Sequence, residues 1–466
     1  MSGPEHNLVL VPPRVAPPLD PLFRPAVLCH RRFRLEVEQS GDSPTVRLAL
    51  ARGEGGVSCY ETAIYAEHHP EARANGRYLE RLLKFLLWSR GAGRVYYEGP
   101  ERWAVYLQKH YQGSPTGRFD ASLMGEKIYE QPFQIEPVAS LPAERESSAP
   151  LGRHLEGCRI GFDLGASDRK VAAVRDGQTV FSEEVPWDPR PRPDPQWHFD
   201  QIMAGLRSAA AHLPKVDAIG GSSAGVLVNN QIKVASLFRA VPEPLFRSRV
   251  KNLFLELKRA WGGIPFEVVN DGEVTALAGA MGLQENAVLG LALGSSQAAG
   301  YVTPEGHITS WLNELAFAPI DYHPQAAVDE WSGDAGCGVQ YLSQQAVGRL
   351  IAPAGLEISP ELPLPERLVQ VQQRMAAGDE RAARIYETIG VYLGYAVGHY
   401  ADFYSFRHVL LLGRVTSGTG GERILQWARR VVSEEFPELT VSLHLPDEKE
   451  KRHGQAMAAA SLPVLS

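Results

Sequence analysis

The segment CRIGFDLGAS, residues Cys158–Ser167, decides the fold. It has the pattern of an apolar strand that runs into a turn containing glycine and serine. Lys170–Arg175 then leads back out and ends at a second turn, Asp176–Gly177. We therefore predict a β-hairpin with polar groups at its tip.

A second segment repeats this design further along the chain. Leu289–Leu293 is apolar, Gly294–Ser296 has the composition of a turn, and Ala298–Val302 is the expected return strand. The spacing of Gly165, Ser167 and Gly177 is the same as that of Gly294, Ser296 and Gly306. Matched spacing indicates two related halves, which would face each other across a cleft.

The two tips have the composition of phosphate-binding turns. Glycine lets the backbone approach a phosphate closely, and hydroxyl and N–H groups donate to its oxygens. The candidate residues are Gly165, Ser167, Lys170, Gly294, Ser295 and Ser296. Only the first copy has a carboxylate, Asp163, where the second has Ala292, and one carboxylate near the phosphates suits Mg²⁺, bound directly or through water. The alternative is a pair of ordinary glycine hairpins, which the matched spacing disfavours.

A candidate general base follows the strand Phe266–Val269. The strand runs into Asn270 and Asp271, and an alanine-rich helix over Glu273–Met281 comes next. At the mouth of a cleft, the Asp271 carboxylate would take the proton from a hydroxyl that attacks a γ-phosphate. The structural alternative is that Asn270 or Asp271 is only the N-cap of this helix.

A glycine-rich loop, Gly413–Gly421, follows the predicted strand His408–Leu412 and precedes another helix. Strand, loop and helix in this order suit a nucleotide base and ribose, with Gly413, Gly418 and Gly420 as candidate contacts. The alternative is a surface connection of low complexity.

These four segments, in this order and spacing, resemble the ROK family of repressors and sugar kinases over about residues 158–462. The resemblance implies an α/β, actin-like ATPase (ribonuclease H-like) fold of two lobes. It also implies transfer of the ATP γ-phosphate to a sugar hydroxyl with Mg²⁺, Asp271 as the catalytic residue, Asn270 and Glu314 as sugar-binding residues, and a homodimer.

The sugar side departs from the family pattern. The family's Gly-Glu-x-Gly-His run is Asn313–Phe317 here, so Glu314 survives and the histidine does not. Of the family's cysteine motif only Cys337 is present, and because one thiolate cannot build a tetrahedral site we expect no zinc. The motif's closing glutamate falls at Val339, and the asparagine of the sugar loop falls near Ser236–Phe238.

Two functions follow from these departures. One is an ATP-dependent carbohydrate kinase, glucokinase-like or of altered specificity. The other is a catalytically weak or inactive regulator or scaffold that binds a sugar or nucleotide. Fewer polar ligands for a hexose fit either altered specificity or lost catalysis.

Residues 1–157 lie outside the resemblance. We predict a proline-rich, extended and unpacked arm at 1–26, an additional α+β domain of unknown role at 27–137, a linker at 138–157, and the two-lobe kinase domain at 158–466. The elements predicted for the α+β domain are a hairpin of Phe33–Glu38 and Thr45–Ala51, a leucine-striped helix ended by Gly91, a strand at Arg94–Tyr97 and a helix at Glu101–Tyr111.

Composition and net charge limit the kinds of partner that we expect for this protein. A net charge of −7 and a pI near 6.1 give no basic footprint for nucleic acid. No apolar run reaches the roughly 20 residues of a membrane span, and the first residues lack a signal-peptide pattern. The four cysteines form no CxxC pair. We therefore expect a cytoplasmic protein whose partner is a small-molecule sugar, with no nucleic acid or membrane.

Overall fold

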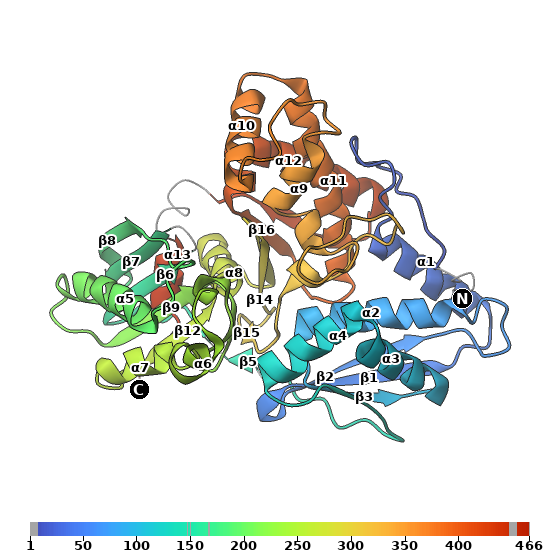
Figure 1. Ribbon diagram of the computed structural model, residues 1–466, viewed down its shortest axis with the longest axis horizontal. Coiled ribbons are helices and arrows are strands. Elements are labelled where there is room, and N and C mark those ends of the chain that lie inside the picture. The colour runs from blue at the N-terminus through green and yellow to red at the C-terminus, as the bar shows by residue number, and fades with distance from the viewer. Residues whose placement is uncertain (1–7, 147, 150, 166–167, 447–453, 466) are drawn as a thin grey trace.

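The computed structural model describes residues 8–146, 148–149, 151–165, 168–446 and 454–465 of the 466-residue chain. Three bodies meet in Figure 1: an N-terminal unit in blue and cyan, a first lobe in green, and a second lobe that runs from yellow to orange. The last helix, α13 (Gln455–Ala460), returns to the first lobe, where the chain entered from the N-terminal unit.

The first lobe is built on a five-stranded sheet of order β12-β9-β6-β7-β8. The strands are β6 (Cys158–Leu164), β7 (Asp168–Arg175), β8 (Gln178–Pro186), β9 (Ala218–Ser223) and β12 (Phe266–Asn270). Helices α5 (Pro195–Ala210) and α7 (Leu253–Ala260) bury apolar side chains on one face, and α13 packs on the other. Between β9 and β12 the chain forms β10 (Val226–Val228), β11 (Gln231–Val234), η3 (Ser236–Phe238), α6 (Glu243–Leu245) and η4 (Phe246–Val250).

The second lobe is built on a six-stranded sheet of order β17-β16-β13-β14-β15-β5. Its strands are β13 (Val288–Leu293), β14 (Gln297–Val302), β15 (Ile308–Thr309), β16 (His408–Leu412), β17 (Ser442–His444) and β5 (Ser148–Ala149). Helix α8 (Asp271–Leu283) covers one face. The other face carries α9 (Gln344–Leu350), α10 (Leu364–Ala376), α11 (Glu380–Ala401) and α12 (Thr419–Glu435).

The two sheets share one topology. Each has an antiparallel meander, β6-β7-β8 or β13-β14-β15, followed by two parallel strands, β9 and β12 or β16 and β17. The predicted hairpins and the predicted duplication are confirmed. The tips differ in length by one residue, because Leu164 pairs with Arg169 whereas Leu293 pairs with Gln297.

Helix α13 lies against the first sheet at very short range. Gly161 on β6 and Gly220 on β9 lie under it, and a Cβ at either position would collide with the carbonyl oxygen of Ala456 or Ala459. These two glycines therefore allow the helix to reach the sheet, and α13 in turn packs against α8 of the other lobe.

The N-terminal unit has a four-stranded sheet of order β2-β1-β3-β4. Its elements are α1 (Ala26–Gln39), β1 (Thr45–Ala51), η1 (Gly53–Gly55), β2 (Val57–Ala63), α2 (Ala74–Arg90), β3 (Arg94–Glu98), α3 (Glu101–Gly113), α4 (Pro115–Ser122), the π-helical η2 (Leu123–Tyr129) and β4 (Gln134–Pro137). The leucine-striped helix is confirmed as α2, and Gly91 follows it with a φ of 79°. The predicted strand and helix after it are confirmed as β3 and α3.

The predicted hairpin of Phe33–Glu38 with Thr45–Ala51 is wrong. Phe33–Glu38 belongs to helix α1, and β1 pairs instead with β2 and β3. The period-two alternation of Phe33, Leu35 and Val37 is incidental, because Leu35 is exposed while Phe33 and Val37 are buried at helical spacing.

The proline-rich arm was predicted to be extended and unpacked. In the described part, residues 8–24 form no helix or strand, contain hydrogen-bonded turns at 17–20 and 20–23, and pack against the second lobe, so the prediction of an unpacked arm is wrong. Phe23 is fully buried among the rings of Tyr341, Tyr392 and Tyr395. The N–H of Leu19 donates to Thr388 Oγ1 at 3.2 Å. Buried side chains spaced along the arm outweigh the cost of ordering it.

The N-terminal unit and the second lobe share one continuous apolar core. Aromatic rings of the unit pack on α11 and the residues just after it, with centroids 5.4 Å apart for His30–His399 and 4.1 Å apart for Phe85–Phe403. The unit is therefore fixed to the second lobe rather than tethered to it.

The segment 138–157, predicted as a linker, runs between the sheets. The backbone of Arg145 exchanges two hydrogen bonds with Val57 of the N-terminal sheet, and β5 adds an edge strand to the second lobe. The domain boundary proposed there stays a prediction.

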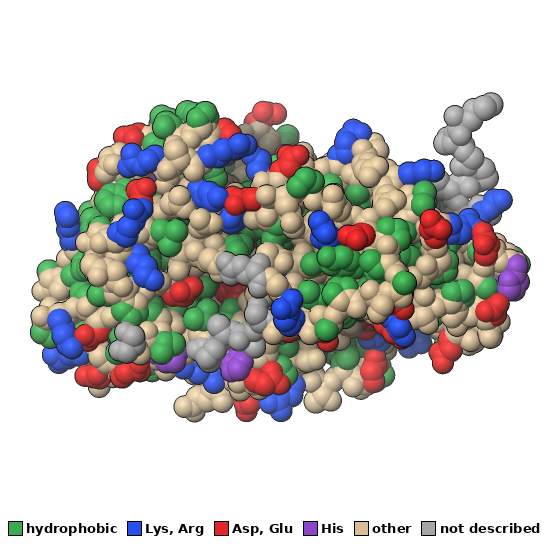
Figure 2. Space-filling model, turned by 90° about the horizontal axis from the view of Figure 1, so that it is seen from below, with side chains coloured by type: hydrophobic (Ala, Val, Ile, Leu, Met, Phe, Trp, Pro, Cys, Tyr) green, Lys and Arg blue, Asp and Glu red, His purple; other side chains and the backbone are tan. Residues whose placement is uncertain are grey.

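Positive and negative side chains are intermixed on the face in Figure 2. Among the described residues no helix has the length and apolarity needed to cross a membrane.

Candidate functional site

Three parallel strands of the first lobe end side by side where the lobes meet. Leu164, Ser223 and Asn270 stand in one row at the ends of β6, β9 and β12. Asp163, one residue earlier on β6, is buried and accepts a hydrogen bond from Ser222 Oγ at 2.7 Å. The carboxyl ends of adjacent parallel strands are where open α/β sheets place their ligands.

Asp163 faces Lys170 across the hairpin. Lys170 is the cross-strand partner of Asp163 on β7, and its Nζ lies 3.7 Å from Asp168 Oδ1. Burial raises the pKa of Asp163, while the Ser222 hydrogen bond and Lys170 oppose that rise.

Asp271 is the first residue of α8, directly after β12. Asn270 is the N-cap, as the structural alternative held: its Oδ1 accepts from the N–H of Gly272 at 2.7 Å, and its Nδ2 donates to the carbonyl of Gly225 at 2.7 Å. A Cβ on Gly272 would collide with the backbone of Ala299 on β14. This close approach brings the start of α8, where Asp271 links β12 of the first lobe to the second lobe, against the second hairpin.

Asp271 lies within electrostatic range of two other carboxyl groups, those of Asp163 and Glu314. Burial, with a further contribution from Asp163, raises the pKa of Asp271 to about 6. Burial, with a contribution from Asp271, raises the pKa of Glu314 to about 8. Glu314 is held by a backbone hydrogen bond of 2.9 Å to the carbonyl of Trp88 on α2. At neutral pH, Asp271 is therefore mainly ionised and Glu314 mainly protonated.

A cavity of about 450 Å³, here called the acceptor cavity, opens beside these groups. Asn270, Glu314 and Gly225 line it together with Glu267 and Trp311. Its volume falls within the range of about 300–1,000 Å³ typical of small-molecule sites. Thus Asn270 and Glu314, the two predicted substrate-binding residues, share one cavity.

The acceptor cavity also has polar residues that the sequence reasoning missed. Glu267 lies three residues before Asn270 on β12, about 10 Å along the strand. Asn229, Ser310 and Trp311 line the same cavity. Tertiary structure alone brings them together, and the one sequence signal was Glu267, a charged residue inside an apolar strand. Among the described lining residues there is no lysine, arginine or histidine.

The first predicted phosphate turn is partly described. The N–H of Gly165 donates to the carbonyl of Asp168 at 3.0 Å, and the Gly165 carbonyl accepts from Trp187 Nε1 at 2.8 Å. Ser167 lies outside the described residues. The roles of Gly165, Ser167 and Lys170 in phosphate binding stay predictions.

The second turn and the glycine-rich loop lie together. Ser295 and Ser296 are exposed at the tip, and the N–H of Gly294 donates to the Ser296 carbonyl at 2.9 Å. Gly413 has a φ of 99°, and a Cβ on it would collide with the backbone of Leu293, the residue before this tip. The loop after β16 therefore lies directly beside the second turn.

The other two glycines of that loop differ from each other. Gly418 is exposed with a φ of 66° and precedes α12. Gly420 is buried, and a Cβ on it would collide with the ring of Tyr386. Close packing of α12 on α11 accounts for Gly420, so a nucleotide contact at this residue has no support from its surroundings.

No protein-family profile and no curated protein matches this sequence. Several solved structures match the structure of this chain. A ROK family glucokinase from Streptomyces griseus, in complex with glucose and AMPPNP, matches with a TM-score of 0.52 and 18% identity over 66% of this chain and 99% of its own. A ROK hexokinase from Thermus thermophilus matches with a TM-score of 0.52 and 17% identity over 66% and 97%. A ROK family transcriptional regulator, a homolog of the E. coli MLC protein, matches with a TM-score of 0.52 and 18% identity over 66% and 78%.

The chain has the fold of the ROK sugar kinases. The predicted two-lobe, actin-like α/β fold is thereby confirmed. The matched share of 66% equals the share of the chain that residues 158–466 make up, and the division into an N-terminal domain and a kinase domain stays a prediction.

The N-terminal unit docks where the ROK motifs are missing. Phe317, at the position of the family's histidine, packs on Trp88 of α2 with centroids 4.3 Å apart and on Trp331 at 5.2 Å. Cys337 is fully buried, and burial raises the pKa of its thiol to about 12. Val339 is buried as well. Thus Phe317 packs on the N-terminal unit, and Cys337 and Val339 are buried.

A buried ionic cluster joins the unit to the loop that carries Cys337. Asp334 of this loop lies 3.0 Å from both Arg81 Nη2 and Lys84 Nζ of α2, and Lys84 also binds Asp120 at 2.9 Å. Burial alone would raise the pKa of Asp334, but Arg81 and Lys84 hold it well below its usual range. This cluster ties the loop to α2. Among the described residues no group of three His, Cys, Asp or Glu is arranged to hold one, and the absence of zinc stays a prediction.

Proposed function

We propose that this chain is a ROK family phosphotransferase that moves the γ-phosphate of ATP to a hydroxyl of a neutral or cationic sugar. The observation that carries the proposal is the grouping of Asp271 with two other carboxyl groups, Asp163 at the end of β6 and Glu314, which lines the acceptor cavity together with Asn270. An enzyme of this type needs a base beside the acceptor and a carboxylate beside the phosphates.

Asp271 would act as the general base. With a pKa of about 6 its carboxylate is available at neutral pH yet more basic than an ordinary aspartate, which suits removal of a hydroxyl proton during attack on the γ-phosphate. Its bond to the N–H of Gly272, at 3.0 Å, orients the side chain at the start of α8.

Asp163 would hold Mg²⁺ with the phosphates of ATP. The fit rests on its buried carboxylate at the strand ends and on Lys170 beside it. Bound Mg²⁺ supplies charge neutralisation on the phosphates. Gly294, Ser295 and Gly413 lie at the neighbouring turns and would approach the nucleotide.

The acceptor cavity favours an uncharged or positively charged ligand. Glu267, Glu273 and Glu314 line it without a cation among the described lining residues, and burial raises the pKa of both Glu273 and Glu314 to about 8, so an anionic acceptor would be buried there without a positive partner. Asn229 and Ser310 offer polar groups to a polyhydroxyl ring, whereas the Trp311 ring is already stacked with Tyr301 and lies under the Arg90 guanidinium. These groups would take the place of two sugar ligands of the family, the histidine that is predicted at the position of Phe317 and the glutamate that is predicted at the position of Val339.

The first test is ADP release from Mg²⁺ and ATP with a panel of hexoses, free hexosamines, N-acetylhexosamines, polyols and hexuronic acids. We expect turnover with at least one neutral sugar or free hexosamine and none with the hexuronic acids. ATP binding without sugar-dependent turnover across the whole panel would contradict the proposal.

The pH dependence of kcat/KM should be bell-shaped. Activity is expected to rise as Asp271 loses its proton, with a midpoint near 6, and to fall as Glu314 ionises near 8 and can no longer donate a hydrogen bond to the acceptor. Measuring kcat/KM from pH 5 to 9 gives both limbs. Glu314→Gln keeps a donor that does not titrate, so it should retain activity and lose only the alkaline limb. A profile that is flat between pH 5 and 7 would exclude Asp271 as the base.

The alternative function is a catalytically weak or inactive regulator or scaffold. It is favoured by Phe317 and Val339, which replace polar family ligands, and by the N-terminal unit that packs against them. The same ADP panel separates the two functions, since a regulator would bind a sugar or nucleotide without turnover.

A further inference from the structure

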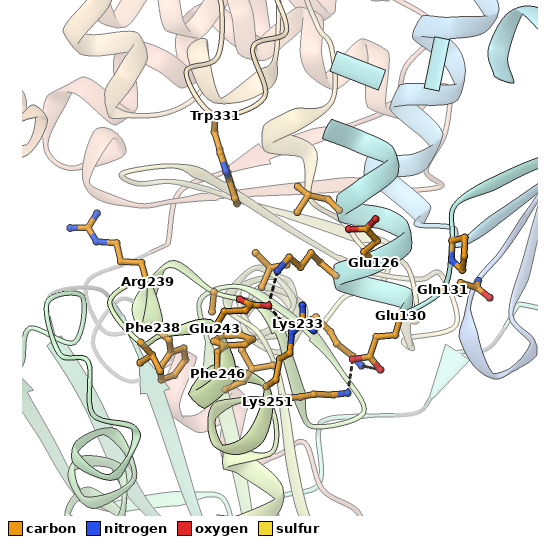
Figure 3. Close-up of a pocket in the computed structure, with 18 residues that line it drawn as sticks. Glu126, Glu130, Gln131, Lys233, Phe238, Arg239, Glu243, Phe246, Lys251 and Trp331 are labelled. Atoms are coloured by element: carbon orange, nitrogen blue, oxygen red, sulfur yellow. Dashed lines mark hydrogen bonds and ion pairs between the residues drawn. The ribbon is translucent and has the colours of Figure 1, made fainter. Parts of the chain in front are cut away.

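A second and larger cavity lies where all three bodies meet. Its volume is about 880 Å³. One wall is η2 and the residues after it, from Leu123 to Pro132, and the opposite wall runs from β11 to Lys251 in the first lobe. Trp331 reaches toward it from its loop in the second lobe (Figure 3). We call it the junction pocket.

The junction pocket contains two clusters in which one carboxylate binds two cations. Glu130 of the N-terminal unit lies 2.5 Å from Lys251 Nζ and 3.4 Å from Lys233 Nζ. Glu243 lies 2.9 Å from both Lys127 Nζ and Arg247 Nε. Dashed lines mark such contacts in Figure 3. Each cluster therefore retains one unit of positive charge.

The remaining charges leave the pocket basic. Arg239 adds a positive charge and Glu126 a negative one, so the lining carries five cations against three carboxylates. This surplus of two occurs in a chain whose net charge is −7. Hydrogen bonds from Lys251 and Lys127 hold the pKa values of Glu130 and Glu243 below their usual range, so both carboxylates stay ionised at neutral pH. A phosphate monoester, with about two negative charges at pH 7, would balance the surplus.

An aromatic side chain completes the site. Trp331 meets Phe119 and Phe317 edge-on, with ring centroids 5.8 and 5.2 Å away. Even so, 58% of Trp331 remains exposed beside the charged clusters. The exposed indole could pack on an apolar ring face of a ligand. The cations beside it could bind a phosphate of the same ligand.

We infer that the junction pocket binds a phosphorylated monosaccharide. The phosphate would lie among Lys127, Lys233, Lys251 and Arg247, and the sugar ring would pack on Trp331. The acceptor cavity has no cation among its described lining residues and would give the same phosphate no positive partner, so the two sites differ in the charge of the ligand that they suit. Because the junction pocket has walls from three bodies, its occupant would hold the N-terminal unit and the Trp331 loop against the first lobe. The inference goes beyond the proposed kinase activity and does not depend on it.

The test is titration calorimetry of the full chain at pH 7.5, without ATP or Mg²⁺ and at constant ionic strength. The probes are glucose 6-phosphate, fructose 6-phosphate, N-acetylglucosamine 6-phosphate, glucose and inorganic phosphate. At least one sugar phosphate should bind at least tenfold more tightly than either glucose or inorganic phosphate. Equal affinity for inorganic phosphate, or no binding by any of the three sugar phosphates, would overturn the inference.

Substitutions test whether the sugar phosphate binds in the junction pocket. Lys251→Gln and Arg247→Gln should each weaken the sugar phosphate at least tenfold, and Trp331→Ala should weaken it while leaving inorganic phosphate unchanged. Arg259→Gln removes an exposed arginine of α7 outside the pocket and should change nothing. Asn270→Ala, in the acceptor cavity, should also leave this affinity unchanged. Loss of binding in Asn270→Ala, or full binding in both Lys251→Gln and Arg247→Gln, would show that the ligand binds elsewhere. Far-UV circular dichroism confirms that each variant is folded.

Discussion

Asp271→Asn should lower kcat/KM for the acceptor sugar by about 10²–10⁴-fold, the range that a positioned general base contributes. The amide keeps the size of the side chain and can still accept from the N–H of Gly272, so α8 should remain capped. What is lost is the group that takes the hydroxyl proton. The rate is measured as ADP release with the best acceptor of the panel, and ATP affinity is measured separately.

The matched control is Asp200→Asn, which changes an exposed aspartate on α5 in the same way. It should retain full activity. ATP affinity in Asp271→Asn should stay within about threefold of the wild type, since Asp163 and the glycine turns are unchanged. If Asp271→Asn kept more than half of the wild-type kcat/KM, the catalytic role assigned to Asp271 would be wrong.

Asp334→Ala should lower the free energy of unfolding by about 3–5 kcal/mol, because removing one partner of a buried ion pair leaves uncompensated charge. The ammonium of Lys84 and the guanidinium of Arg81 both lie 3.0 Å from the Asp334 carboxylate and are almost inaccessible to water. Denaturation in urea, followed by far-UV circular dichroism, measures the change.

Glu61→Ala is the comparison for an exposed pair. Glu61 Oε2 lies 2.7 Å from Arg47 Nε on the open surface of the N-terminal sheet, and its loss should cost less than about 1 kcal/mol. The two variants should also differ in pH dependence. The pKa of Asp334 is held below its ordinary value, so its contribution is complete above about pH 4 and declines at lower pH. A loss of less than 1 kcal/mol in Asp334→Ala would contradict a stabilising role for the cluster.

Local sequence pattern predicted the elements that carry the candidate chemistry. The strands at Cys158–Leu164 and Val288–Leu293 alternate with glycine turns, and Asp271 comes directly after a short apolar strand, so each motif could be assigned to a strand end. Strand ends and turns depend on neighbouring residues, which is why these predictions were confirmed.

The N-terminal third was harder to predict. In residues 33–38 a period of two and a period of 3.6 both fit the apolar pattern, and only packing of α1 against α2 and α11 separates them. The arm from residue 8 has no periodicity at all, and its order comes from pockets on the second lobe that receive Phe23 and Val15.

The sequence by itself determined the duplicated hairpins and the assignment of Asp163 and Asp271 to strand ends, because repeated spacing and turn chemistry are local properties of the chain, while the two-lobe fold and the role of Glu314 were inferred from the resemblance to the ROK family. Tertiary structure decided which polar groups share a cavity. Glu267, Trp311 and the clusters around Glu130 and Glu243 come from distant segments, which the packing of the two lobes and the N-terminal unit brings together. Charge and burial at such junctions depend on contacts between segments far apart in the chain, which no spacing along the sequence contains.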